Sequence, residues 1–342
     1  MTGQPSETEA AVTMTHPEGS IRIGPSPTPG RRRITTALNE GLTGSSLREC
    51  ETAYPDELIA VILEIKGPGW ICDEILREES ADYVEHTLRR ELGAYVPGGA
   101  MAGRRVLDFG CGGLASTLTL ARMYPDATII GTDFNPGHLR IARARHAFYK
   151  QRNIQILDQP SPSEIPDIGT VDLIVLSAVV EHMLPDERRV MLPKLWEKLA
   201  AGGVLFVSDT PHRWFPIEAH TTKLPLLNYQ SDAAAYRRTL GLGMTDMGRT
   251  WPEMLRAGIR GSTEREIIDC LTSGRRHEAA IMTPSGPGIR SRADLWYAGL
   301  THGRKQLLKM AAKRTLEAIQ LVTGTLVTQN ITLAVRKTSV PR

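Results

Sequence analysis

The chain has 342 residues, 41% of them hydrophobic, and a net charge of +3 at pH 7. Because this length exceeds the ~100–200 residues of a usual domain, we expect one core with sizeable additions, or two domains. The small net charge gives no reason to expect a nucleic-acid partner. No apolar run approaches the ~18 residues of a membrane span, and no signal-peptide core is present. The four cysteines, at positions 50, 72, 111 and 270, lack disulfide or zinc-finger spacing, which favours a reduced, cytoplasmic protein.

The N-terminal part of the chain changes character near residue 51. Before it, the sequence is rich in Pro, Ser, Thr and Gly and poor in large apolar side chains, so we predict a flexible tail over residues 1–50. After it, residues 58–63 form an apolar run, Gly67-Pro68-Gly69 marks a break, and apolar side chains then recur at helical spacing. We predict a helical layer over residues 51–103, with Trp70 and Tyr83 as candidates to line a substrate pocket.

A glycine-rich turn follows an apolar run at residues 106–113, where the sequence reads Val-Leu-Asp-Phe-Gly-Cys-Gly-Gly. Residues 114–120 can then form a helix. This order predicts a buried parallel strand, a tight turn and a helix N-terminus. Glycine is required where the backbone bends sharply or where a ligand approaches more closely than a Cβ allows. The free N–H groups and the positive dipole end of the helix favour a nucleotide-type ligand at Gly110 and Gly112.

Two kinds of nucleotide fit these glycines. Gly110, Gly112 and Ala115 satisfy the spacing of a dinucleotide-binding turn, and Asp133 lies at a suitable distance to hold a ribose. Asp108, at the end of the strand, argues against that ligand because a carboxylate there would repel a pyrophosphate. It would attract a ligand that carries a cationic amino group. The Asp-x-Gly-x-Gly arrangement resembles motif I of the class I S-adenosylmethionine-dependent methyltransferases, in their small-molecule, type 11-like branch.

The segments that follow agree with this resemblance. Further strands are expected over residues 127–133, 154–158, 171–177 and 203–209, with helices between them. This alternation predicts an α/β fold with a Rossmann-like, mostly parallel sheet of about seven strands, whose S-adenosylmethionine-binding core is residues 104–210.

The resemblance also implies how the cofactor, S-adenosylmethionine, is held. Asp108 would contact its amino-acid end, Asp133 the ribose and Asp158 the adenine. The structural alternatives are that Asp108 merely caps the next helix and that Asp158 is an ordinary turn residue. The full set of predicted cofactor-binding residues is Asp108, Gly110, Gly112, Asp133, Phe134, Asp158 and Ser177.

The sequence after the fifth strand is longer than the plain fold needs. Residues 211–290 are predicted to form a substrate-defining insert that includes a helix capped by Thr263 and a sixth strand near residues 279–282. Residues 291–342 are predicted to form a basic helix and a final strand over residues 327–335. The basic face could bind an anionic membrane or substrate, although a solvated helix is the simpler interpretation.

Histidines and acids near the C-terminal edge of the sheet are the candidates for catalysis. Glu181-His182 resembles the Glu-His of many small-molecule methyltransferases. Because histidine transfers protons near neutral pH, His182 and His212 are the candidate bases, with a structural role as the alternative for His182. The candidate substrate-binding residues are Trp214, Glu181, His220 and Tyr83. No metal is expected, although Glu181, His212, Glu218 and His220 offer suitable ligand atoms.

Together these features predict methyl transfer from S-adenosylmethionine to the O, N or C atom of a small organic acceptor, in secondary metabolism. A homodimer is allowed for, and neither a nucleic-acid partner nor a membrane span is expected. Two other functions remain open. One is an S-adenosylmethionine-binding protein that does not methylate, and the other is an NAD(P)-dependent oxidoreductase, which Asp108 disfavours.

Overall fold

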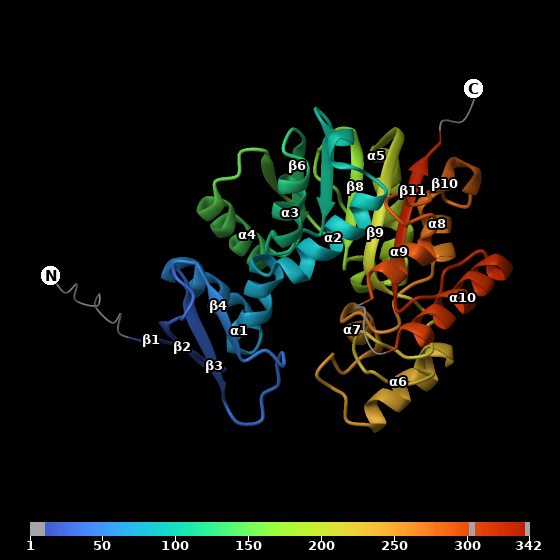
Figure 1. Ribbon diagram of the computed structural model, residues 1–342. Coiled ribbons are helices and arrows are strands. Elements are labelled where there is room, and N and C mark those ends of the chain that lie inside the picture. Colours follow the sequence, from blue (N-terminus) through green and yellow to red (C-terminus); the bar gives the residue numbers. More distant parts are fainter. Residues whose placement is uncertain (1–10, 301–304, 339–342) are drawn as a thin grey trace.

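A seven-stranded sheet forms the centre of the protein in the computed structural model, which describes residues 11–300 and 305–338 (Figure 1). The strand order is β10-β11-β9-β8-β5-β6-β7. The five strands β5 to β9 run parallel, and β11 is antiparallel to both of its neighbours. The strands are β5 (Arg105–Phe109), β6 (Thr128–Asp133), β7 (Ile154–Asp158), β8 (Val171–Ser177), β9 (Leu199–Pro211), β10 (Ala279–Ile281) and β11 (Asn330–Lys337). The predicted α/β fold with a mostly parallel sheet is confirmed.

Helices cover both faces of this sheet because the central strands are apolar on both sides. Neighbouring residues of a strand point to opposite faces, so Val106 and Leu107 of β5 belong to two different core clusters. Helices α2, α3 and α4 contribute to the first cluster, and α5 and α8 to the second. The helices are α1 (Asp56–Glu79), α2 (His86–Glu91), α3 (Ala115–Met123), α4 (Pro136–Tyr149), α5 (Pro185–Lys198), α6 (Asp232–Gly241), α7 (Trp251–Arg256), α8 (Glu264–Leu271), α9 (Arg292–Ala298) and α10 (Gln306–Thr323).

A second, antiparallel sheet occupies most of the segment that we predicted as a flexible tail. Its strands, in order, are β1 (Val12–His16), β2 (Gly19–Pro25), β3 (Arg32–Leu38) and β4 (Glu49–Thr52). The prediction of a tail over residues 1–50 is therefore wrong for these strands, and residues 1–10 lie outside the described residues. The segment has few large apolar side chains, but Ile21, Ile23 and Ile34 share one face of the sheet and are buried with Ile59 of α1.

The break predicted in the N-terminal helical region is a kink within α1. Gly67 has a φ of +65°, which is outside the helical range, and the helix continues to Glu79. Beyond the sheet, the helix cap at Thr263 is confirmed, because its Oγ1 accepts a hydrogen bond from the Glu266 N–H at 3.1 Å. The predicted basic helix corresponds to α10. None of its residues is buried, and Leu321 is 88% exposed.

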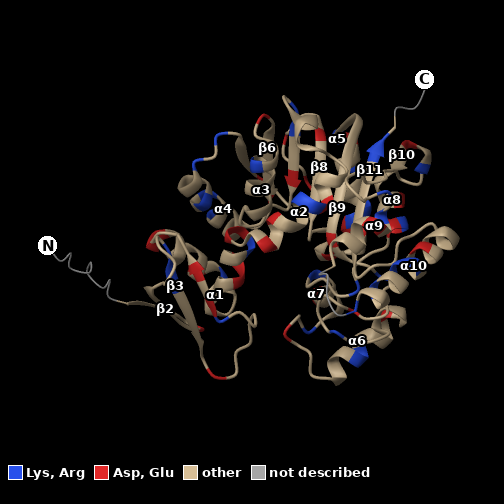
Figure 2. Ribbon diagram, viewed as in Figure 1, with Lys and Arg blue, Asp and Glu red and all other residues tan. Residues whose placement is uncertain are grey.

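Charges of both signs are interspersed over the helices, in keeping with the small net charge (Figure 2). Among the described residues, none of the helices combines the length and the apolar character needed to cross a membrane.

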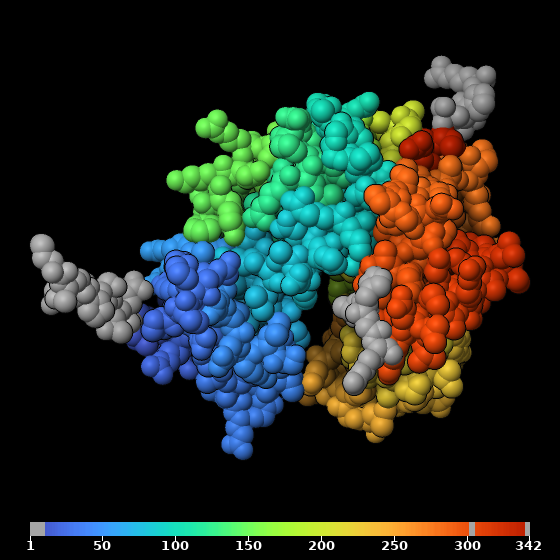
Figure 3. All heavy atoms as spheres, in the orientation of Figure 1, coloured from blue at the N-terminus to red at the C-terminus, as the bar shows by residue number. Residues whose placement is uncertain are grey.

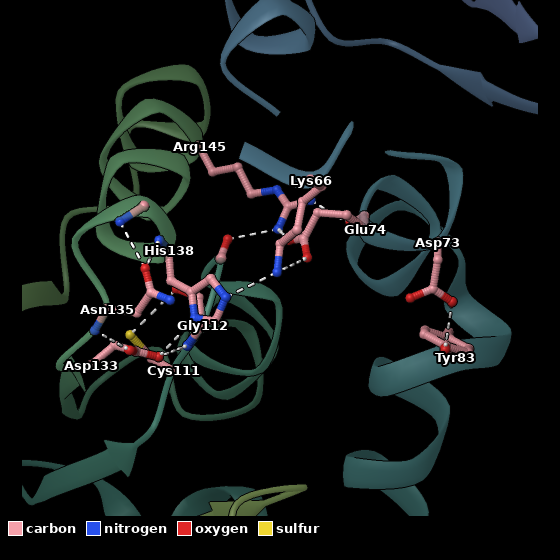
Figure 4. A network of polar contacts seen from close by, with 12 residues as sticks. Lys66, Asp73, Glu74, Tyr83, Cys111, Gly112, Asp133, Asn135, His138 and Arg145 are labelled. Atoms are coloured by element: carbon pink, nitrogen blue, oxygen red, sulfur yellow. Dashed lines mark hydrogen bonds and ion pairs between the residues drawn. The ribbon is translucent and has the colours of Figure 1, made fainter. Parts of the chain in front are cut away.

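One buried arginine joins the N-terminal helix to the central fold. Arg145 of α4 is fully buried, and its Nη1 donates hydrogen bonds to Glu74 Oε1 of α1 at 2.7 Å and to the Gly113 carbonyl at 2.6 Å (Figure 4). Its Nε donates to the hydroxyl of Tyr54 at 3.1 Å. A Cβ on Gly113 would lie 2.2 Å from Glu74 Oε1, so only glycine leaves room for this contact. Helices α1 and α4 and the glycine turn are therefore held by one guanidinium group.

We expect Arg145→Met to lower the free energy of unfolding by about 3–5 kcal/mol, because the buried acceptors of Arg145 lose their donor and Lys66, at 3.4 Å, alone remains paired with the carboxylate of Glu74. Urea denaturation of the full chain measures this change. Arg140→Met is the matched control on the same helix, since Arg140 pairs with Glu64 at the surface. Its unfolding midpoint should stay at the wild-type value. Equal midpoints for the two variants would contradict the structural role of Arg145.

Candidate active site

A cavity of about 430 Å³ lies at the C-terminal edge of the parallel strands. This volume is in the range of ~300–1,000 Å³ that small-molecule sites occupy. Its walls come from α1, from the glycine turn with the end of β6, and from residues 177–187 at and beyond the end of β8, with Arg256 of α7. Figure 3 shows the surface hollowed between the N-terminal segment in blue and the orange segment. The predicted cofactor and catalytic residues that line the cavity are Gly110, Gly112, Asp133, Phe134, Ser177 and His182.

The glycine turn brings the backbone of β5 close to the end of β6. Gly110 has a φ of +78° and Gly112 a φ of +51°, both in the left-handed region that favours glycine. A Cβ on Gly110 would lie 2.8 Å from Val179 Cγ2, whereas a Cβ on Gly112 would meet nothing within 4 Å. The N–H of Gly112 donates a hydrogen bond to Asp133 Oδ2 at 3.0 Å. Val179 thus packs closely against the turn at Gly110, whereas the turn is open to the cavity at Gly112.

Asp133 is oriented by a network that reaches back to α1 (Figure 4). Its Oδ1 accepts from the N–H of Asn135 at 2.7 Å, and its Oδ2 lies 3.4 Å from Nδ1 of His138. Nζ of Lys66 contacts Nε2 of His138 at 3.0 Å. Because an ammonium group only donates hydrogen bonds, Nε2 must accept, and Nδ1 carries the proton that it donates to Asp133. Burial raises the pKa of Asp133, but the hydrogen bonds from His138, Asn135 and Gly112 outweigh this effect and hold the pKa below its ordinary value.

Two acids from the predicted set lie outside the cavity. Asp108 is buried beneath the glycine turn, where it accepts hydrogen bonds from the hydroxyls of Ser116, at 2.7 Å, and Thr117. Burial raises the pKa of Asp108 to about 6, although both hydroxyls oppose the shift. Asp108 thus anchors the first turn of α3, in agreement with the structural alternative. Asp158 is exposed and pairs with Arg143, while its neighbour Gln159 lines the cavity.

Glu181, His182 and His220 form a cluster, and of these three residues His182 lines the cavity. The His182 and His220 rings lie 5.5 Å apart in an edge-on arrangement. Nδ1 of His182 lies 2.9 Å from the Arg256 carbonyl, so Nδ1 donates and Nε2 is the free acceptor. Glu181 is fully buried, and burial raises its pKa to about 8. The pKa of His182 is lowered, chiefly because burial disfavours its charged form.

The remaining predicted residues do not line the cavity. His212 is buried, its Nδ1 accepts from the Trp214 N–H at 3.0 Å, and burial lowers its pKa to about 4. Trp214 is 43% exposed and packs beside the ring of His212. The hydroxyl of Tyr83 donates to Asp73, which does line the cavity, at 3.1 Å. Glu218 accepts from the backbone and hydroxyls of Thr221 and Thr222.

Several cavity residues were missed in the sequence. Those on α1 recur at spacings of three and four residues, which places them on one helix face, and this pattern could have found them. Gln159 is one position away from the predicted acid, and Arg256 lies in the insert, where no pattern marks it. The missed residues with charged, amide or imidazole side chains are Lys66, Asp73, Glu74, Arg77, Asn135, His138, Gln159, Glu187 and Arg256.

Comparison with known proteins gives a match over the central region. Residues 107–205 match the model of a family described as a methyltransferase domain. A trans-aconitate 2-methyltransferase of Deinococcus radiodurans is 36% identical over 121 residues, which cover 34% of this chain and 42% of that protein. The enzyme of the same name from Methylobacterium radiotolerans is 40% identical over 119 residues, which cover 34% of this chain and 41% of that protein. The one from Paracidovorax citrulli is 34% identical over 164 residues, which cover 46% of this chain and 58% of that protein.

The match therefore spans only 41% to 42% of the length of the first two relatives. It coincides with the part of the chain that holds the glycine turn, Asp133 and the parallel strands β5 to β9. Residues 107–205 are therefore similar to a methyltransferase domain, and they lie within a mostly parallel sheet of the kind that the sequence predicted.

Proposed function

We propose that this protein transfers a methyl group from S-adenosylmethionine to a small organic acceptor. The observation that carries the proposal is a single cavity lined by the glycine turn, Asp133, Arg77 and His182. A site of this kind can hold two small molecules side by side. When bound, S-adenosylmethionine supplies a methyl group that is already activated by its sulfonium. The protein then mainly has to hold the two reactants in line.

The residues of the cavity fit this cofactor. Gly112 leaves open space where a side chain would otherwise stand, and its φ tolerates no ordinary residue without strain. Asp133 retains acceptor capacity on Oδ1, which takes one backbone hydrogen bond, and could accept from a ribose hydroxyl. Phe134 is 48% exposed beside it and offers an aromatic face to a base. We assign Gln159, rather than the predicted Asp158, to the adenine.

The charges that line the cavity favour an acidic acceptor. Lys66 pairs with Glu74, and Arg256 pairs with Glu187. Among the described residues, Arg77 forms no ion pair with a carboxylate and contacts the ring of Tyr83 instead. An acceptor carboxylate would supply the missing charge, and its oxygen needs no base before it receives a methyl group. The relatives named trans-aconitate 2-methyltransferase agree with an organic acid.

For an acceptor that must lose a proton, we keep His182 as the candidate base. Its Nε2 is unprotonated and it lines the cavity. The same role for His212 is not supported, because this residue lies outside the cavity. Trp214 and Tyr83 could contact only a substrate that extends beyond the cavity. We retain in this proposal the predictions that the protein acts in secondary metabolism, lies in the cytoplasm and can form a homodimer.

Asp133→Asn should weaken S-adenosylmethionine binding roughly 10- to 150-fold, because a hydrogen bond to a charged group contributes about 1.5–3 kcal/mol. Calorimetric titration with S-adenosylmethionine, its demethylated product and NADPH measures this change. Asp158→Asn is the matched control at the end of the neighbouring strand and should leave the affinity unchanged. Binding of NADPH alone by the wild type would make the protein an oxidoreductase and sink the proposal.

Gly112→Ala should impair cofactor binding by more than its backbone strain explains, since the new methyl group enters the cavity. Gly103→Ala is the control, because Gly103 also has a positive φ, +68°, and open space around it but lies before β5. We expect similar losses of thermal stability in the two variants and a loss of cofactor affinity only in Gly112→Ala. Equal affinities would place the cofactor away from the turn.

Transfer of labelled methyl groups to a panel of acceptors tests the activity itself. We expect product with carboxylic acids such as trans-aconitate and none with simple amines. Arg77→Met should raise the KM for the acid roughly 10- to 100-fold, as expected when a charged contact worth about 1.5–3 kcal/mol is lost, and leave cofactor affinity intact. Arg140→Met, outside the cavity, should change neither quantity. Cofactor binding without transfer to any acceptor would favour a protein that does not methylate.

A further inference from the structure

We propose that Glu181, His182 and His220 bind one divalent transition-metal ion, such as Zn²⁺, at the wall of the cavity. One carboxylate oxygen and one nitrogen from each histidine all lie within 4.8 Å of one another. Imidazole nitrogens with a carboxylate oxygen suit Zn²⁺, Fe²⁺ and related ions. This inference does not depend on methyl transfer, because it concerns binding of the metal alone.

The first observation behind the proposal is an unpartnered oxygen. The side chain of Glu181 is completely buried, and its Oε2 accepts a hydrogen bond from the Thr210 hydroxyl at 2.9 Å. Its Oε1 has no hydrogen-bond partner among the described residues. A buried polar atom without a partner is unfavourable, so such an oxygen indicates a missing ligand. Oε1 lies 3.9 Å from Nε2 of His182.

The second observation is that the cluster is already oriented for metal binding. The Arg256 carbonyl accepts the Nδ1 proton of His182, which leaves the Nε2 lone pair free. Ligand histidines commonly have a support of this kind on the other ring nitrogen. Gly258 packs so closely on the rings that a Cβ there would lie 2.8 Å from Nε2 of His220. Its φ of +95° is also one that favours glycine.

The three ligand atoms, which lie within 4.8 Å of one another, must move closer together to complete the site. In a tetrahedral site with bonds of about 2.0–2.2 Å, ligand atoms lie roughly 3.3–3.6 Å apart. The separation of 3.9 Å between Glu181 and His182 is close to this value. His182 and His220 are both accessible to solvent, so a cation can reach the cluster. The positive charge of Arg256 beside the cluster is offset by its ion pair with Glu187.

A metal at this place would act on the acceptor. Three protein ligands leave at least one coordination position, and His182 lines the cavity in which the acceptor is proposed to lie. That position could take an acceptor oxygen, orient it and lower the pKa of a hydroxyl. Nε2 of His182 would then be a ligand rather than a base, so the two roles of this nitrogen exclude each other.

Titration of the chelator-treated full chain, without a histidine tag, with Co²⁺ and Zn²⁺ tests the proposal. We expect one ion per chain by calorimetry and visible absorption bands from bound Co²⁺. Glu181→Gln and His220→Gln should each raise the Kd for the metal roughly 100-fold. Losing only a contact that supports a ligand typically costs ~10–100-fold, so the loss of a ligand should reach at least the upper end of that range. His277→Gln, which changes an exposed histidine outside the cluster, should leave the Kd unchanged.

His220→Cys guards against variants that merely unfold. A thiolate is also a good ligand, so this variant should keep binding Co²⁺ and add a sulfur-to-metal charge-transfer band. No stoichiometric binding by the wild type would overturn the proposal, as would a Kd that survives Glu181→Gln and His220→Gln unchanged. In either case Glu181 would be a buried, protonated carboxyl group and not a metal ligand. Cofactor affinity, measured separately, would report on the proposed function independently.

Discussion

Burial of the Arg145 guanidinium is the constraint on which the rest of the site depends. A charged group without solvent must be matched by acceptors, and here they come from a carboxylate of α1, the turn carbonyl of Gly113 and a tyrosine hydroxyl. The three partners belong to segments that are far apart in the sequence. Satisfying one side chain therefore fixes the placement of the N-terminal helix on the nucleotide-binding turn.

The same helix continues this connection to the cofactor side. Lys66 directly precedes the kink at Gly67, and it contacts both the carboxylate of Glu74 and the ring of His138. His138 in turn holds Asp133. A series of polar contacts thus runs from a buried ion pair to the carboxylate that we assign to the ribose. Such support keeps a binding group in place before its ligand arrives, which reduces the ordering that binding must otherwise cause.

The central fold could be predicted because its signals are local. Apolar runs that end in an acid, followed by glycine or by a helix cap, specify parallel strands and their turns without knowledge of the rest. The strands at the N-terminus escaped prediction because Ile21, Ile23 and Ile34 become a core only against α1, a contact that composition does not reveal. The family resemblance assigned Asp158 to the adenine, but the chain turns so that Gln159 lines the cavity. Residues of the insert, such as Arg256, are placed by tertiary packing alone.

The contact between Lys66 and His138 has a consequence for how this sequence can diverge. The ammonium group determines which nitrogen of the ring carries the proton, and only that tautomer turns a donor toward Asp133. In a neutral ring, an acceptor at position 66 would take the proton onto Nε2 and leave Nδ1 as an acceptor facing Asp133. Positions 66, 133 and 138 should therefore change together or not at all among related proteins, as one inherited unit spread over three separate elements of the fold.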